Sequence, residues 1–235
     1  MNTHTSTPDT LTPLQYTADT VGFNGFLPED FEVFAVPEFA PRMARIRQCL
    51  QPKLLRIGEA LAPRLSEALQ ETVYPHVARH LRRTVNPPQE TWVAFARNPR
   101  AYKPFVHLRV TISEERIRVL VFCEDDAPDK SLFASNLQER AESLADHFAH
   151  HPHLLSFDLQ DPEGHPLRGH ALTPEVLRDF ARRLQNVRGQ HAAFGIVFHR
   201  DHPIVQNGPE FLDAVVAAVV NLNPLYQCGQ ALHRA

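Results

Sequence analysis

Three short segments between residues 91 and 123 alternate apolar and polar side chains and follow one another closely. The segments are Thr91–Ala96, Phe105–Ile112 and Arg116–Cys123. They are rich in β-branched and aromatic residues, which favour strands over helices. The stretches that separate them, around Asn98 to Arg100 and around Ser113 to Glu115, carry residues typical of turns. Because short turns join antiparallel neighbours, the sequence predicts a three-stranded antiparallel meander.

Segments with helical spacing of apolar residues lie on both sides of the meander. Between Glu38 and Leu69 apolar residues recur every three or four positions, and Pro52 predicts a break because an interior proline removes a backbone donor. The pattern predicts further elements, in chain order: a helical turn over Tyr74–Leu81, a helix over 131–149, a strand over Leu154–Leu159, a helix over Pro174–Gln185 capped by Thr173, a strand over Ala192–His199 and a helix over Glu210–Val220. This order favours an α+β fold class with a mainly antiparallel sheet and helices packed on it.

Length and composition indicate one folded unit. A chain of 235 residues with 43% apolar residues suits a single hydrophobic core, so we expect a single α+β domain over residues 21–235 after a flexible tail over residues 1–20. No run approaches the roughly 18 apolar residues of a membrane helix, and the polar start lacks the order of a signal peptide, which predicts a cytoplasmic protein without a membrane partner. Cys49, Cys123 and Cys228 lack paired spacing, so we expect buried free thiols.

Positive charge is concentrated between Arg79 and His107. The whole chain has a formal net charge of −3, whereas this segment holds six lysine and arginine residues and one acid, Glu90. A local excess of one sign attracts ions of the other sign, and arginine suits bidentate contacts to phosphate or carboxylate. A GC-rich genome also produces abundant arginine and scarce lysine, but it does not explain the clustering.

We therefore expect a ligand-binding surface in this segment, where cations, the single tryptophan and rigid turns coincide. The candidate binding residues are Arg82, Arg83, Asn86, Trp92, Arg97, Arg100, Tyr102, Lys103 and His107. Arginine can hold a phosphate while an aromatic ring stacks on a base, so the first hypothesis is a binding module for an anionic ligand, a nucleotide or a nucleic-acid strand.

Two alternatives remain open. The chain could be an enzyme on a small phosphorylated or carboxylated substrate, with His76, His80 or His107 as the acid–base group. A structural or protein-interaction role is the other alternative, and it predicts that the basic residues are buried in ion pairs within the molecule, with Trp92 buried in the sheet.

Other polar groups could carry chemistry, but each also has a structural interpretation. His147 and His151 share the i, i+4 spacing of zinc ligands, with His150 and His153 beside them and Asp146 or Asp158 as a further ligand, although a solvent-exposed helix end explains them as well. Glu124–Asp126 and His199–His202 follow strands and could supply acid–base groups or simply form loops. The sequence contains no phosphate-binding glycine motif, nucleophile elbow or paired-cysteine motif, so no cofactor and no metal are expected, and the oligomeric state is open.

Several segments in the first half of the sequence carry a resemblance to a known family. Two sets of segments carry it: a weaker set, Gly25-Phe26 with Glu29–Phe34 and Arg42-Met43 with Pro52–Leu54 and Ile57–Glu59, and above all Tyr74–Ala78, Arg82–Pro88, Thr91–Phe95 and Tyr102-Lys103 to His107. Together they resemble the YktB-like family of uncharacterised proteins (UPF0637, domain of unknown function DUF1054). The resemblance is strong over residues 22–110 and general beyond them. It implies a compact α+β protein with a curved antiparallel sheet, and it implies no established activity.

Overall fold

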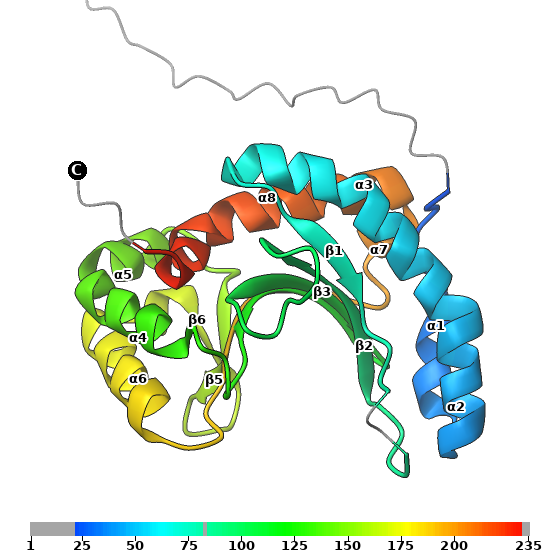
Figure 1. Ribbon diagram of the computed structural model, residues 1–235, viewed down its shortest axis with the longest axis horizontal. Helices are drawn as coiled ribbons and strands as arrows, with labels where there is room; N and C mark the ends of the chain where they lie inside the picture. The colour runs from blue at the N-terminus through cyan, green and yellow to red at the C-terminus, as the bar shows by residue number, and fades with distance from the viewer. Residues whose placement is uncertain (1–21, 82–83, 232–235) are drawn as a thin grey trace, which may run out of the picture.

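The computed structural model describes residues 22–81 and 84–231 of the chain. Its centre is a seven-stranded sheet in the order β1-β2-β3-β4-β7-β5-β6, and every strand pairs with its neighbours in antiparallel fashion. The sheet is strongly curved, and the helices lie along its convex side (Figure 1). The predicted single α+β domain with a mainly antiparallel, curved sheet is confirmed. The tail expected over residues 1–20 lies outside the described residues.

The strands are β1 (Tyr74–Val77), β2 (Glu90–Ala96), β3 (His107–Ser113), β4 (Arg116–Cys123), β5 (Leu155–Gln160), β6 (Pro166–Arg168) and β7 (Ala192–His199). The helices are α1 (Pro28–Glu32), α2 (Phe39–Arg45), α3 (Gln51–Leu69), α4 (Lys130–Glu139), α5 (Ala141–Ala149), α6 (Pro174–Asn186), α7 (Pro203–Gln206) and α8 (Gly208–Tyr226). The predicted meander is confirmed as β2, β3 and β4. β7 has the predicted bounds, and α6 begins after the predicted cap, where the Thr173 hydroxyl accepts from the backbone N–H of Val176.

The prediction of a helical turn over Tyr74–Leu81 is wrong, because Tyr74–Val77 form the edge strand β1 paired with β2. Pro75 lacks a backbone donor, and an edge strand is the place in a sheet that tolerates this. α3 packs closely on β1 at a glycine: a Cβ on Gly58 would lie 2.9 Å from the Cβ of Pro75. Tertiary packing therefore decides the conformation of a segment whose local pattern was ambiguous.

Two helical regions are divided at other positions than the sequence predicts. The break expected near Pro52 is a single π-helical stretch, Ile46–Leu50, between α2 and α3, and Pro52 lies in the first turn of α3, where proline loses no hydrogen bond. The helix expected over 131–149 is two helices, α4 and α5, because Arg140 leaves the helical region (φ −96°, ψ 14°). β6 was not predicted.

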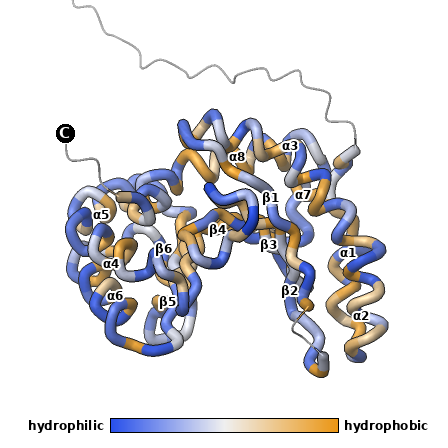
Figure 2. Tube along the Cα trace, in the orientation of Figure 1, coloured by the Kyte–Doolittle hydropathy of each residue, from blue (hydrophilic) through white to orange (hydrophobic). Residues whose placement is uncertain are grey.

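The core lies between the convex side of the sheet and the helices. α3 packs on β1 and β2, while α8 packs on β3, β4 and β7 and on α3. Figure 2 shows apolar residues concentrated in the strands and in helices such as α8. α8 is long and apolar enough to cross a membrane by length and composition alone, and here it is a core helix. Cys123 and Cys228 are buried free thiols as predicted, but Cys49 is exposed.

The alternation of strand residues gives the sheet two different faces. Val93 and Phe95 of β2 and Val110 of β3 point into the core beneath the helices. Their neighbours in the chain therefore point to the opposite side, since successive side chains of a strand alternate. This second side is the concave face of the sheet, and it brings together residues from four strands.

Candidate functional site

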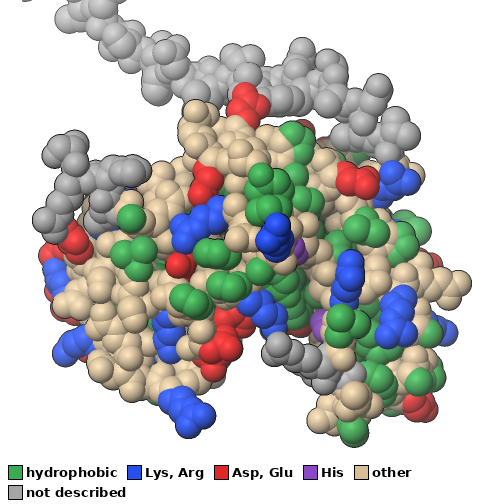
Figure 3. All heavy atoms as spheres, in the orientation of Figure 1, with side chains coloured by type: hydrophobic (Ala, Val, Ile, Leu, Met, Phe, Trp, Pro, Cys, Tyr) green, Lys and Arg blue, Asp and Glu red, His purple; other side chains and the backbone are tan. Residues whose placement is uncertain are grey.

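The concave face is lined by three rows of residues that face one another across the strands. The strand register aligns Trp92, Thr111, Arg118 and Val197 in one row, Ala94, Arg109, Leu120 and Gly195 in the next, and Ala96, His107, Phe122 and Ala193 in the third. Figure 3 shows basic, acidic and hydrophobic side chains side by side beneath the arch of the sheet. Aromatic rings and paired charges on an otherwise apolar sheet surface are the type of lining that ligand sites use.

Arg109 is the centre of this face, and its side chain is 5% exposed. Its Nε donates to Nε2 of His107 at 2.8 Å, and its Nη2 donates to the carboxylate of Glu124. The guanidinium carbon lies 3.7 Å from the ring centre of Phe122 and 4.6 Å from that of Trp92. A buried cation is stable only when it is paired and hydrogen-bonded, and Arg109 meets both conditions while aromatic rings enclose it.

His107 is fully buried and fixed in one tautomer. Because Nε of Arg109 can only donate, Nε2 of His107 accepts, and Nδ1 carries the proton that it donates to the carbonyl oxygen of Phe105 at 2.7 Å. Burial, and secondly the charge of Arg109, hold the pKa of His107 well below its ordinary value. Both ring nitrogens are engaged, so His107 positions Arg109 and has no free nitrogen for proton transfer.

A second arginine crosses the same face. Arg118 on β4 forms an ion pair with Glu90 on β2, so its side chain spans β3, which lies between those strands. Its guanidinium carbon is 5.3 Å from the ring centre of Phe157 on β5. The two Arg–Glu pairs, Arg109–Glu124 and Arg118–Glu90, leave the floor of the concave face close to electrically neutral.

The loops at both ends of β2 flank this floor. Tyr102, from the loop between β2 and β3, places its ring 5.0 Å from that of His107 and 5.6 Å from that of His76. Burial raises the pKa of Tyr102, while the charge of Arg109 and the indole N–H of Trp92 lower it in part. From the loop between β1 and β2, His80 packs edge-on against Trp92 at 5.3 Å.

The structure brings together some of the predicted binding residues and separates others. Trp92, Tyr102 and His107 converge around Arg109. Arg97 instead points away from them: its Nη2 donates to Asp129 at 2.7 Å, and its guanidinium packs on Phe105. The remaining predicted residues divide as follows: Asn86, Arg100 and Lys103 are exposed in the flanking loops, and Arg82 and Arg83 lie outside the described residues.

Sequence reasoning missed a histidine–carboxylate pair at the edge of the concave face. Nε2 of His191 lies 2.9 Å from Oδ1 of Asp158, and the other oxygen of Asp158 accepts from the backbone N–H of Ala193 at 2.5 Å. The imidazole stacks on Phe122 at 5.4 Å. The hydrogen bond to Asp158 raises the pKa of His191, and burial opposes it. His191 and Asp158 are brought together only by the pairing of β5 with β7, so no spacing along the chain could indicate that they interact.

The other polar groups named from the sequence have structural partners. His147 and His151 have ring centres 4.5 Å apart, but Nε2 of His147 binds the carbonyl oxygen of Asn221 at 2.7 Å. Arg200 pairs with Glu32, and the ring of His202 accepts the backbone N–H of Ile204 at the start of α7. Of the three acids that follow β4, Glu124 is the partner of Arg109.

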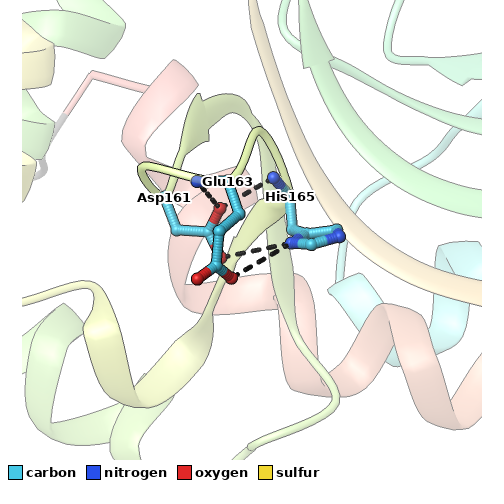
Figure 4. A group of neighbouring side chains, drawn as sticks. All are labelled: Asp161, Glu163 and His165. Carbon is cyan, nitrogen blue, oxygen red and sulfur yellow. Dashed lines mark hydrogen bonds and ion pairs between the residues drawn. The ribbon is translucent and has the colours of Figure 1, made fainter.

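Within residues 22–81 and 84–231, one group of three side chains has the spacing for a metal ion. Asp161, Glu163 and His165 lie together in the turn between β5 and β6 (Figure 4). Asp161 Oδ1 accepts the backbone N–H groups of Glu163 and His165 at 3.0 and 2.8 Å, which is how an aspartate stabilises a tight turn. Glu163 and His165 are exposed. Turn formation accounts for this arrangement without an ion.

These features define a class of protein: a single α+β domain with helices on the convex side of a curved antiparallel sheet and a charged, aromatic concave face. The chain belongs to the family described as "Domain of unknown function (DUF1054)", whose model matches residues 26–226. A UPF0637 protein of Macrococcus caseolyticus is 34% identical over 205 residues, which are 86% of this chain and 97% of that protein. Those of Shouchella clausii and Bacillus velezensis are 32% and 31% identical, over 86% and 87% of this chain and 93% and 96% of their own lengths.

The resemblance noted from the sequence is thereby confirmed, and it extends further than expected. The match reaches residue 226, whereas the sequence motifs were strong only to about residue 110. β7 and the His191–Asp158 pair therefore lie within the matched region.

The buried, neutral His107 makes stability depend on pH. Its pKa is about 6.5 in the unfolded chain and lower in the folded protein, so the unfolded state binds more protons as the pH falls. The contribution of neutral His107 to the free energy of unfolding is fully present above about pH 6.5. It is lost progressively as the pH falls towards the folded pKa, by up to about 1.4 kcal/mol per pH unit. We expect His107→Gln, which keeps an acceptor for Arg109, to flatten this loss in urea unfolding between about pH 7.5 and 5.5.

His153 is exposed and has no ion pair with another described residue, so His153→Gln provides the control and should leave the acid-side loss unchanged. His191, with its raised pKa, acts in the opposite sense and loses its stabilising effect as the pH rises. It is present in both variants, so the comparison isolates His107. An unchanged pH slope in His107→Gln would contradict the assignment of a buried neutral imidazole.

Proposed function

We propose that the concave face binds a nucleotide, either free or within a single strand of nucleic acid. The observation that carries the proposal is the convergence of Trp92, Tyr102 and Phe122 around one guanidinium. Nucleotide ligands combine a planar base with a phosphate, and aromatic rings with nearby cations suit both parts. Base–aromatic stacking contributes about 1–3 kcal/mol per base, which is enough for recognition without many direct hydrogen bonds.

The cations that would meet the phosphates are in the flanking loops. Arg79 follows β1, and Arg100 and Lys103 lie between β2 and β3; all three are exposed, and none forms an ion pair with another described residue. By contrast, Arg97, Arg109 and Arg118 are each paired with an acid. The division gives a neutral, aromatic floor with positive charge at both ends of β2.

The described parts of both loops make hydrogen bonds that hold them to the rest of the protein. Asn98 Oδ1 accepts the backbone N–H of Arg100 at 2.8 Å, and the Asn98 carbonyl oxygen lies 2.9 Å from Nε2 of His76. At the other loop, Nη1 of Arg42 donates to the carbonyl oxygen of Pro88 at 3.1 Å. Cations held by fixed loops lose less entropy on binding, which favours them as ligand contacts over cations on free side chains.

Binding should weaken steeply with salt, because phosphate contacts release counterions. We expect labelled single-stranded oligonucleotides to bind with a slope of log K against log salt of about −0.7 for each phosphate contact. Arg100→Gln with Lys103→Gln should reduce that slope by about one contact each and lower affinity at low salt. Mononucleotides in the same assay distinguish a free nucleotide from a strand, since a mononucleotide engages only one end of β2.

Arg182→Gln with Arg183→Gln on α6 is the matched control, because it removes two exposed charges from the helix layer instead of from the concave side. This control variant should bind as the wild type does. The proposal fails if nucleotides and oligonucleotides do not bind, or if binding is independent of salt.

The enzyme alternative has one observation in its favour, the His191–Asp158 pair. A buried carboxylate that orients an imidazole is the arrangement that acid–base catalysis requires, and Asp158 is only 5% exposed. His76 and His80 are instead hydrogen-bonded to Asn98 and Thr91, and His107 has no free ring nitrogen. If a phosphorylated or carboxylated substrate is turned over, His191→Gln should abolish turnover and spare binding, whereas retained turnover excludes this pair.

A further inference from the structure

Three buried polar atoms on the concave face have no hydrogen-bond partner among the described residues. They are Nε1 of Trp92, Oγ1 of Thr111 and Nε of Arg118. The strand register places these residues directly opposite one another on β2, β3 and β4, and Thr111 is 1% exposed. Two are obligatory donors and the third is a hydroxyl that can donate.

Such a row is unusual because buried polar groups are almost always hydrogen-bonded. A buried donor without an acceptor is destabilising, and the concave face gathers three such groups in one row, whereas Ser156 Oγ and Asn223 Oδ1 are single cases elsewhere in the described protein. Neighbouring arginine nitrogens show the contrast: Nη2 of Arg118 is paired with Glu90, while Nε of the same side chain is not. Unpaired buried groups are most often explained by a missing partner.

The Tyr102 hydroxyl interacts with one member of this row, the indole N–H of Trp92. The Trp92 indole N–H lowers the pKa of Tyr102, although burial is the larger influence and raises it. The Tyr102 hydroxyl is therefore close to the indole N–H, although the two make no hydrogen bond of good geometry in the structure. The row is ready to donate and no side chain of the described protein accepts.

We infer that this row, Trp92, Thr111 and Arg118, binds the oxo edge of a nucleobase, with the C4 carbonyl oxygen of uracil or thymine accepting from two of its donors. The inference rests on the proposed function and specifies which base the concave face prefers. Because Glu90 neutralises Arg118, the row offers donors without net charge and suits a carbonyl oxygen better than a phosphate. Phe157, over which the Arg118 guanidinium lies, and Trp92 supply the flat apolar surfaces that a base stacks on.

The row is buried, so the base reaches it when a covering side chain moves. Arg118 is that side chain: it crosses β3 at the level of Thr111 on its way to Glu90, and Glu90 is 33% exposed. A guanidinium on a long side chain can turn within the face without disturbing the strands. The guanidinium turns about its ion pair with Glu90, which keeps its charge neutralised, uncovers Thr111 and leaves Arg118 as one wall of the base site.

Cytosine is the natural comparison, because it differs from uracil at the recognised edge. The uracil C4 carbonyl accepts hydrogen bonds, whereas the amino group at the same position of cytosine donates them. An amino group facing a row of donors leaves both sides unpaired. Sites built for one hydrogen-bonding pattern reject the wrong partner strongly for this reason, and we expect oligouridylate to bind at least about tenfold more tightly than oligocytidylate.

The test compares Thr111→Val with Thr91→Val in the full chain, using oligouridylate and oligocytidylate as probes. Valine has the shape of threonine without the hydroxyl. Thr111 Oγ1 is unpaired, so Thr111→Val should leave the urea midpoint unchanged or raise it, and it should reduce the preference for uracil severalfold. Thr91 Oγ1 is hydrogen-bonded to Nε2 of His80 at 3.1 Å, so Thr91→Val should lower the midpoint and keep the preference.

The outcomes separate the two proposals. If both oligonucleotides bind but Thr111→Val keeps the full preference for uracil, or if the wild type shows no preference, the inference is overturned and nucleotide binding stands. If Thr111→Val lowers the urea midpoint as much as Thr91→Val does, the hydroxyl already has a partner and the row is not a vacant site. If neither oligonucleotide binds the wild type, the proposed function and the inference fall together.

Discussion

The burial of one positive charge, the guanidinium of Arg109, sets the conditions for the whole concave face. A cation can be taken out of water only with an opposite charge and further hydrogen bonds, and Glu124 and His107 supply them. His107 must then stay neutral and in one tautomer, and Tyr102, Trp92 and Phe122 must pack around the charge. Removing one partner of such a pair typically costs about 3–5 kcal/mol, so the arrangement of these side chains is fixed as a unit.

The distribution of helices makes this unit accessible as a surface. α3 and α8 cover the convex side of the sheet and bury the alternate residues of β2, β3 and β4, while the concave face is closed mainly by its own long side chains and by the loop that carries Tyr102. The paired arginines leave the floor neutral, and Arg79, Arg100 and Lys103, which form no ion pair with another described residue, lie at its margins. Unpaired positive charge is thus exposed to solvent at the margins of the face, and the aromatic rings lie on its floor.

Much of the fold follows from the sequence, because its signals are local. Alternation between residues 91 and 123 and short turns are sufficient to predict β2, β3 and β4, and the cap at Thr173 marks the start of α6. β1 could not be predicted, since Pro75 is tolerated only at a sheet edge and the sequence does not say where the edge lies. The break at Arg140 depends on how α4 and α5 each pack on α6, which is also not a local property.

The candidate site is less predictable for the same reason. Trp92, Tyr102 and His107 of the basic segment lie around Arg109, but charge alone could not tell that Arg97 turns towards Asp129. Arg109, Glu124, Asp158 and His191 come together through the pairing of β3, β4, β5 and β7, which no spacing along the chain reveals. The structural alternative predicted ion pairs for the basic residues of this segment, and among the described ones Arg97 has such a pair, with Asp129.

Trp92 offers the most direct measurement of the central claim, that the concave face is the ligand surface. It is the only tryptophan in the chain, so intrinsic tryptophan fluorescence reports on this face alone. Titration with an oligouridylate strand should quench or shift the Trp92 emission, with the same midpoint and salt dependence as binding measured through a label on the strand. Saturable binding of the labelled strand that leaves the Trp92 emission unchanged would place the ligand elsewhere and contradict the account.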